Sequence, residues 1–240
     1  MANTSKVNVA LPTATGSNVD VANRSGRYGD QFVAPIGGGR TNVCDEGSYF
    51  VVTNPTPGTG LATIATLTAL ADTSPFFMLI NNASAGGKRV YMDYIKLLVT
   101  DAGTAGASLH YNVKIDNGVG RYTSGSALTS TPQNCNMDSS VATGCLAYGG
   151  PLVAAAATAA ARLLGGGLFK VSIPVVGDNY ILTFGCPASG VGQGVATIAN
   201  AVLNHAPVVI GPQQSFFFHI WLPSQSAASS YEIEVGWWER

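Results

Sequence analysis

Hydrophobic residues dominate the carboxy-terminal part of the chain, and their order predicts two β-strands. In a strand, successive side chains point to opposite faces of the sheet. In the first predicted strand one face carries Phe216, Phe218, Ile220 and Leu222, and the other carries Phe217, His219 and Trp221. Neither face is mainly polar, so we expect this strand to be buried on both sides.

The last strand, residues 231–238, alternates in a different way. One face carries Tyr231, Ile233, Val235 and Trp237, and the other carries Glu232, Glu234 and Trp238. This alternation is typical of a strand with one face in the core and one in water. A chain with such an ending is built from sheets.

A further pair of strands is predicted at residues 89–100 and 107–116. The second of these alternates apolar and polar positions, which is the period of a strand with one buried face. The linker 101–106 between them contains two glycines. We therefore expect an antiparallel hairpin with a longer loop.

Shorter elements complete the pattern. Strands are predicted at 48–53, 61–70, 76–80, 169–175, 180–184 and 207–210, with a helix as the alternative at 61–70 and no assignment at 195–203. The alanine-rich window 154–164, which ends at three glycines, predicts the one short helix. The polar segment 117–151 is longer than an ordinary connection between two strands, so we expect a functional or interfacial loop there.

Together these elements predict an all-β protein, an antiparallel two-sheet jelly-roll-like sandwich with one short helix. Residues 48–240 form this sandwich as one domain, since single all-β domains often reach about 200–250 residues. Residues 1–47 lack a sustained apolar period and predict an extended N-terminal arm. Its basic residues Arg24, Arg27 and Arg40 favour docking on a partner, and the alternative is a solvated tail.

Charged residues make up only 10% of the chain, against about 25% in an average soluble domain. Since a free monomer usually keeps its surface wet with charged side chains, we expect other subunits to cover much of this surface. The net charge of −1 argues against nucleic acid as a partner, because phosphate binding needs clustered Lys and Arg. No apolar stretch is long enough to span a membrane, and the polar first residues do not resemble a secretory signal peptide.

The spacings that support catalysis or cofactor binding are missing. No serine has glycine two positions away on both sides, as the nucleophile elbow of a hydrolase requires. The glycines before Lys88 and those of segment 190–194 lack the spacing of phosphate and dinucleotide loops. No close pairs occur among the histidines and cysteines, which are His110, His205, His219, Cys44, Cys135, Cys145 and Cys186. We therefore expect no enzyme, no cofactor and no metal site.

For the individual polar residues that could act in catalysis or ligand binding, structural roles are favoured. For His219, which lies among aromatics, a hydrogen-bonded core or interface role is favoured over that of a ligand or base. Turn and ladder roles are favoured over paired-carboxylate catalysis for Asp93, Asp116 and Asp178. Cys135 and Cys145 could close a small disulfide in an oxidising compartment, but without an export signal we expect reduced thiols.

Four segments of the sequence are 45–50 (DEGSYF), 54–58 (NPTPG), 88–94 (KRVYMDY) and the ending 210–240. They resemble a family of virion structural proteins from tailed bacteriophages, the small jelly-roll type that decorates or cements the capsid. The resemblance implies trimers or other symmetric clusters, assembled in the host cytoplasm, that sit on the lattice of the major capsid protein. It also implies an arm that reaches a neighbour, and no catalytic residues.

The leading hypothesis is thus a non-enzymatic phage decoration protein that acts by adhesion. The alternatives are a jelly-roll major capsid protein, a receptor- or glycan-binding tail appendage and, last, a hydrolytic tail enzyme. For glycan binding, at most one of Trp237 and Trp238 would be exposed for stacking, since adjacent residues face opposite sides. The residues expected at an interface are Arg24, Arg27, Tyr28, Arg40, Phe217, His219, Trp221 and Trp238.

Overall fold

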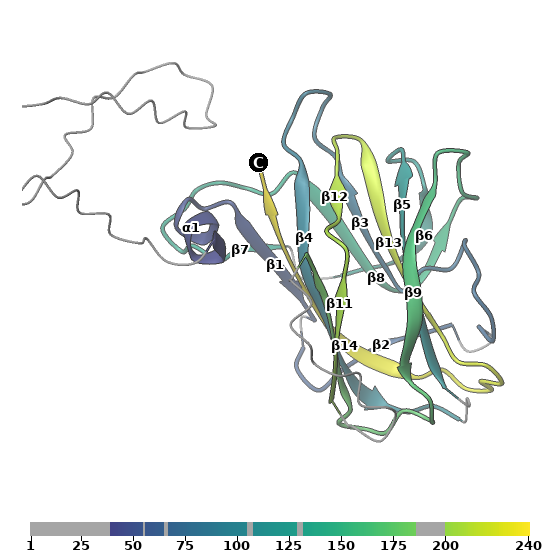
Figure 1. Ribbon diagram of the computed structural model, residues 1–240. Helices are drawn as coiled ribbons and strands as arrows, with labels where there is room; N and C mark the ends of the chain where they lie inside the picture. Colours follow the sequence, from purple (N-terminus) through teal and green to yellow (C-terminus); the bar gives the residue numbers. More distant parts are fainter. Residues whose placement is uncertain (1–38, 55, 65–66, 105–107, 129–131, 186–199) are drawn as a thin grey trace, which may run out of the picture.

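Two β-sheets lie face to face in the computed structural model (Figure 1). The structure describes residues 39–240 except 55, 65–66, 105–107, 129–131 and 186–199. Sheet 1 contains, in spatial order, β11 (Asn200–His205), β10 (Asn179–Phe184), β4 (Val90–Asp101), β14 (Ser230–Glu239), β1 (Tyr49–Thr53) and β7 (Gln133–Asn134). In addition β12 (Val209–Ile210) pairs with β4, and β2 (Leu61–Ala62) pairs with β14.

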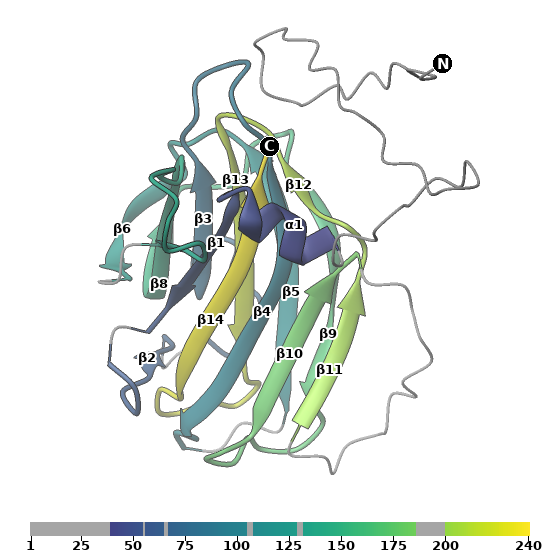
Figure 2. The same cartoon turned by 90° about the vertical axis from the view of Figure 1, so that its left-hand side faces the viewer.

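Sheet 2 packs against the inner face of sheet 1, and Figure 2 shows sheet 1 in front of it. Its spatial order is β6 (Tyr122–Ala127), β8 (Cys145–Ala154), β3 (Phe77–Asn81), β13 (Gln214–Trp221), β5 (Leu109–Asn117) and β9 (Arg162–Lys170). The one helix among the described residues, α1 (Gly39–Asp45), leads into β1.

Eight of the strands pair in the pattern of a jelly roll. In chain order these are β1, β3, β4, β5, β9, β10, β13 and β14. The first pairs with the eighth, the second with the seventh, the third with the sixth and the fourth with the fifth, all antiparallel. One long antiparallel hairpin folded over on itself produces this nesting, which is the jelly-roll topology. The predicted all-β, two-sheet fold is confirmed.

Aromatic side chains fill the space between the sheets. Phe169 of β9 has its ring centroid 4.4 Å from Tyr111 of β5 and 5.3 Å from Tyr180 of β10. Near the edge formed by β9 and β11, a Cβ added at Gly165 would lie 2.2 Å from the His205 ring. Glycine is therefore required at this position, because the two sheets approach closely there.

Strand β13 is buried on both faces, as the sequence predicts. Every residue from Ser215 to Ile220 is at most 1% exposed. Phe216 and Phe218 point into the core between the sheets. Phe217 points to the opposite face of sheet 2, where it packs in a second cluster with Met78, Ile80, Leu152 and Ala154.

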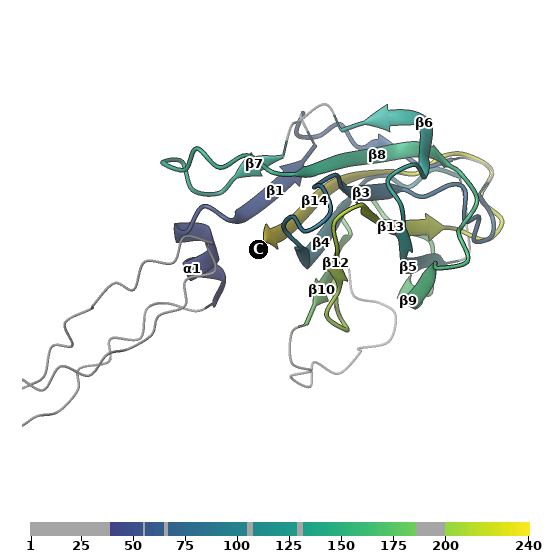
Figure 3. The same ribbon diagram turned by 90° about the horizontal axis from the view of Figure 1, so that it is seen from above.

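Two chain segments cross the outer face of sheet 2 and cover this second cluster (Figure 3). One runs from β5 to β6 and the other from β8 to β9, because the strands that they join lie on opposite sides of β13. The segments pair through Arg121, whose carbonyl accepts from the Ala155 amide (2.7 Å) and whose Nε donates to the Ala155 carbonyl (2.9 Å). The Arg121 guanidinium lies 4.4 Å from the centroid of the Phe217 ring.

A network of buried charges holds the crossing segments in place. Arg121 forms ion pairs with Asp116 and, at 2.9 Å, with Asp72, and Lys114 pairs with Asp72 at 2.7 Å. Asp116 also accepts a hydrogen bond from the Thr158 amide (3.0 Å). Burial alone would raise the pKa of Asp116, but the hydrogen bonds from Thr158 and Arg121 outweigh it and hold this pKa below its usual value.

The predicted hairpin of 89–100 with 107–116 is wrong. The first segment is β4 in sheet 1 and the second is β5 in sheet 2, so they lie in facing sheets instead of pairing. Their period of two indicates that each strand has a buried face, and it does not specify the neighbouring strand.

The predicted helix at 154–164 is wrong as well. Ala154 ends β8, its amide donates to the Thr73 carbonyl at 2.8 Å, and β9 begins at Arg162. Helix propensity is a weak preference that tertiary contacts override. The three glycines after the window lie inside β9, where they pair with Val113, Asn112 and Tyr111.

Further expectations need correction. The predicted loop 117–151 contains β6, β7 and most of β8, while the strand predicted at 61–70 is reduced to Leu61–Ala62. The strand predicted at 169–175 ends at Lys170, so Val171 and Ile173 lie outside it and are exposed. Within the unassigned 195–203, residues from 200 on belong to β11. Of the predicted arm, residues 39–47 are described and contain α1.

The charge network predicts a large effect of Arg121→Ala on stability. Removing the guanidinium leaves Asp116, which is 3% exposed, as an uncompensated buried charge, a change that costs about 3–5 kcal/mol. Urea unfolding at pH 7 measures this loss. Arg162→Ala, at an exposed position of β9, is the control and should change the free energy of unfolding by less than about 0.5 kcal/mol. Equal effects of the two substitutions would contradict the role of the network.

Candidate functional site

The residues expected at an interface occupy three different environments. Phe217 and His219 are both 1% exposed within the single chain. Their side chains lie beneath the crossing segments and offer no surface to a partner in this conformation. Arg24, Arg27 and Tyr28 lie outside the described residues.

Trp221 and Trp238 are half-buried and lie on different sheets. Trp221 of β13 stacks on His110 with centroids 5.2 Å apart, and Trp238 of β14 stacks on Tyr91 with centroids 5.6 Å apart. The rings of the second pair are inclined by only 2°. Each stack leaves part of an aromatic surface in contact with water, so both tryptophans remain candidates for contact with a partner.

Arg40 of α1 contacts its own subunit. Its guanidinium lies 2.5 Å from the carboxylate of Asp93 on β4, which is 1% exposed, and the Tyr49 hydroxyl donates to the same carboxylate at 2.6 Å. Burial, followed by this hydrogen bond to Asp93, raises the pKa of Tyr49 well above its usual value. The contact attaches α1, which directly follows residues 1–38 in the sequence, to sheet 1.

His219 is surrounded by the charge network. Its Nε2 lies 3.3 Å from the Asp72 carbonyl, and its neighbours include the charged groups of Asp72, Lys114 and Arg121. Burial lowers the pKa of His219 to about 4, and the nearby cations act in the same direction. The imidazole is therefore neutral at pH 7, which agrees with the predicted hydrogen-bonded core histidine.

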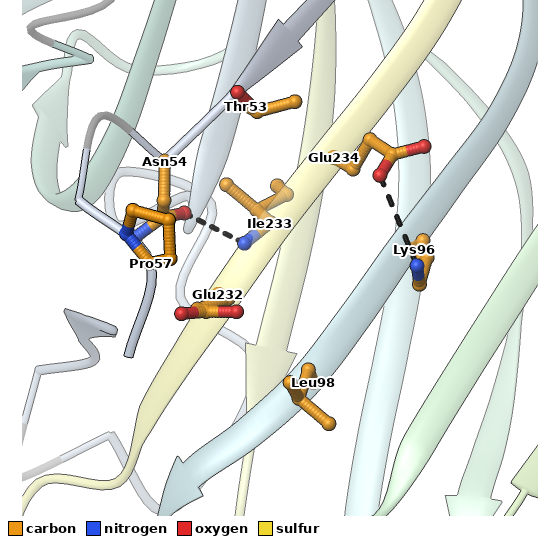
Figure 4. Close-up of a pocket in the computed structure, with 8 residues that line it drawn as sticks. All are labelled: Thr53, Asn54, Pro57, Lys96, Leu98, Glu232, Ile233 and Glu234. Carbon is orange, nitrogen blue, oxygen red and sulfur yellow. Dashed lines mark hydrogen bonds and ion pairs between the residues drawn. The ribbon is translucent and has the colours of Figure 1, made fainter. Parts of the chain in front are cut away.

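A hollow lies on the outer face of sheet 1, where β14 and β4 pass the end of β1 (Figure 4). Glu232 and Glu234 point into it from one face of β14, and Lys96 lies 3.8 Å from Glu234. Asn54 closes one side, since its Oδ1 accepts from the Ile233 amide at 2.7 Å. The remaining lining residues are Thr53, Pro57 and Leu98.

The carboxylates of this hollow already have partners. Tyr94 donates its hydroxyl to Glu234 at 2.5 Å, and Glu232 accepts a hydrogen bond from the Gly58 amide. The hollow measures about 190 Å³, whereas pockets that enclose a small-molecule ligand measure about 300–1,000 Å³. The site is suited to a small polar group at most.

Among the described residues, a metal site, a reactive cysteine or a membrane-spanning helix would also bear on function. No group of three or more His, Cys, Asp or Glu in this part of the chain is arranged to hold a metal ion. Cys44, Cys135 and Cys145 are free thiols, and burial raises the pKa of Cys145 far above its usual value. Cys186 lies outside the described residues. Within those residues, no helix is both long enough and apolar enough to cross a membrane.

Aliphatic side chains gather along β9 and the segment that follows it. We define the β9 patch as Leu163, Leu168, Val171, Ile173, Val175 and Val176, all of which are exposed. The sequence does not predict this patch, because aliphatic residues in a strand-like order are expected to face a core. The signal that could have revealed it is the pair Pro174 and Gly177, which interrupt the strand pattern.

Comparisons of the chain with protein-family models, with curated proteins and with solved structures find no match. We therefore infer the function from the fold, the surface composition and the side chains described above.

The burial of His219 predicts that stability falls as the pH falls from about 6.5 to about 4. In this range the unfolded chain binds a proton at His219, with a usual pKa of 6.5, and the folded protein does not. The difference is worth about 3 kcal/mol over the full range. His219→Gln should reduce this slope in urea unfolding measured at several pH values.

His110→Gln is the matched control, because His110 is only partly buried and should account for little of the slope. The lowered pKa values of Asp72, Asp116 and Asp178 act separately, since their contribution is lost only as the pH falls below about 4. An unchanged slope in His219→Gln would contradict the assignment to this histidine.

Proposed function

We propose that this protein is a non-enzymatic structural component that works by adhesion, and specifically a decoration or cement protein of a phage virion. In this role copies of the chain associate with one another and with the major capsid protein. The resemblance of segments such as 88–94 and 210–240 to phage decoration proteins supports the specific form of the proposal.

The jelly-roll topology is compatible with this role and with other functions. Double-sheet jelly rolls are used by viral capsid proteins, by lectins and by cupins. A cupin holds its ligand between the sheets, and in this chain aromatic side chains such as Tyr111, Phe169 and Tyr180 fill that space. This packing favours functions that use the outside of the sandwich.

The observation that carries the proposal is the β9 patch on a chain with so few charges. Monomeric soluble proteins rarely expose large contiguous apolar patches, and such patches usually mark a site of association. With 10% charged residues, the remaining surface offers little to keep separate copies apart. Both features favour a protein whose surface is covered in the assembled state.

The state of the purified chain tests this proposal. We expect native mass spectrometry at about 10 µM to show a discrete oligomer, because association at such concentrations needs only about −7 kcal/mol. Electron microscopy of the same sample should show small symmetric clusters. Closed shells formed by the chain alone would instead favour a major capsid protein, and a monomer at about 100 µM would contradict the proposal.

A glycan-binding appendage is the second candidate, and the stack of Trp238 on Tyr91 is the observation that favours it. Half-exposed aromatic faces are suited to stacking against sugar rings. If this function holds, Trp238→Ala should abolish binding on a glycan array. Trp221→Ala, which disrupts the similar stack on the other sheet, should leave binding intact. No binding by the unmodified chain would exclude this candidate.

A further inference from the structure

We propose that β9 pairs with β9 of a second copy of this chain, so that two copies join sheet 2 into one continuous sheet across a two-fold axis. This inference rests on the proposed function, which requires self-association, and adds the surface and its symmetry.

The outer edge of β9 is available for pairing. β9 is the last strand of sheet 2, and among the described residues only β5 pairs with it. Along the side away from β5, its nine residues pair with no described strand, although the His205 ring of β11 lies close to Gly165. Backbone groups left unpaired at an edge form a template for a further strand. An antiparallel partner of the same sequence satisfies these groups on both copies at once.

Of the features that usually protect an edge, β9 has two register irregularities in its pairing with β5, between Leu163 and Gly165 and between Leu168 and Lys170, but it has no proline. Protected edges carry outward-facing charges, prolines or bulges that prevent pairing with another chain. In β9 the only charged residues are at its two ends, Arg162 and Lys170. Lys170 is neutralised by Asp178, with 2.6 Å between Nζ and the carboxylate, and it is largely buried. The middle of the strand is three glycines, whose backbone has no side chains to keep a neighbour away.

The remaining edges of the two sheets are less suitable. Strand β6, the other edge of sheet 2, contains no aliphatic residue larger than alanine, and strand β7 has only two residues. Strand β11 is polar at both Asn204 and His205, and it pairs with β10 in the parallel direction. The aliphatic side chains gather instead at β9, where Leu163 is 64% exposed and Val176 is 62% exposed.

The size of the β9 patch agrees with a contact between copies. Its six side chains leave an area on the order of 500 Å² in water, which is the size of the largest apolar patch on a typical monomer, and such patches are often functional. A standard interface buries about 800 Å² per partner, which the patch and the strand backbone together approach. The uncharged surface does not match a charged partner, so a second copy is the better fit.

A two-fold axis through the glycines places complementary groups opposite each other. In this arrangement the Leu163 end of one β9 lies beside the Leu168 end of the other, and each contact occurs twice. The Val171–Val176 segment, which follows β9 directly, flanks the contact on each copy. The arrangement predicts an even number of copies, in contrast to the trimer that the family resemblance implies.

Sedimentation equilibrium of the full chain tests the inference, with Leu163→Lys and Leu168→Lys as variants. Each places an unpaired charge in the proposed interface, and we expect the dissociation constant to rise at least tenfold. Leu146→Lys on β8 is the matched control, because Leu146 is 44% exposed and Leu168 is 41% exposed. It should stay within about twofold of the unmodified chain, a change expected of a surface substitution. Circular dichroism checks that every variant is folded.

Sensitivity at both ends of β9, with an even-numbered oligomer, supports the strand pairing. If the chain associates but neither leucine variant weakens it, the β9 contact is wrong and the proposed self-association stands. If only Val175→Lys weakens association, the contact uses the following segment and the strand pairing is overturned. An unmodified chain that stays monomeric at about 100 µM would overturn both this inference and the proposed function.

Discussion

Strand β13 has apolar side chains on both faces, and the fold has to exclude water from both. Burying each of its phenylalanines stabilises the fold by about 1.5–3 kcal/mol. Sheet 1 covers one face, where Phe216 and Phe218 pack in the core. The other face needs a separate cover, which the two crossing segments provide over Phe217. Because those segments consist mainly of glycine and alanine, they have few side chains to hold them in place, and their attachment depends on the pairs formed by Arg121 with Asp72 and Asp116.

This arrangement determines which surfaces remain for contact with other molecules. The crossing segments enclose Phe217 and His219 within the subunit. Strand β13, which is rich in aromatic residues, therefore offers no surface for an interface. The edges of the sheets and the outer face of sheet 1 remain. Of these, β9 combines unpaired backbone with exposed aliphatic side chains, while the hollow near Glu232 is small and its carboxylates are engaged. The proposed adhesive role therefore depends on an edge.

The sequence predicts the class of the fold and the faces of its strands, but not their partners. Alternation in 231–238 and the apolar run at β13 indicate burial correctly, because side-chain period depends only on local geometry. The pairing of β4 and β5 with other strands depends on contacts distant in the chain, so the hairpin prediction failed. The alanines of 154–164 failed as a helix for the same reason. The β9 patch was missed because composition cannot tell an aliphatic residue that faces a core from one that faces a partner.

Each subunit covers both faces of β13 by itself. Amide hydrogen exchange of β13, measured in protein diluted until it is monomeric, is the decisive experiment. We expect residues Ser215–Ile220 to exchange only through global unfolding of the subunit, in the monomer as in the associated protein. Rapid exchange of β13 in the monomer, with protection restored on association, would contradict this expectation. The cover over Phe217 would then come from a neighbouring subunit.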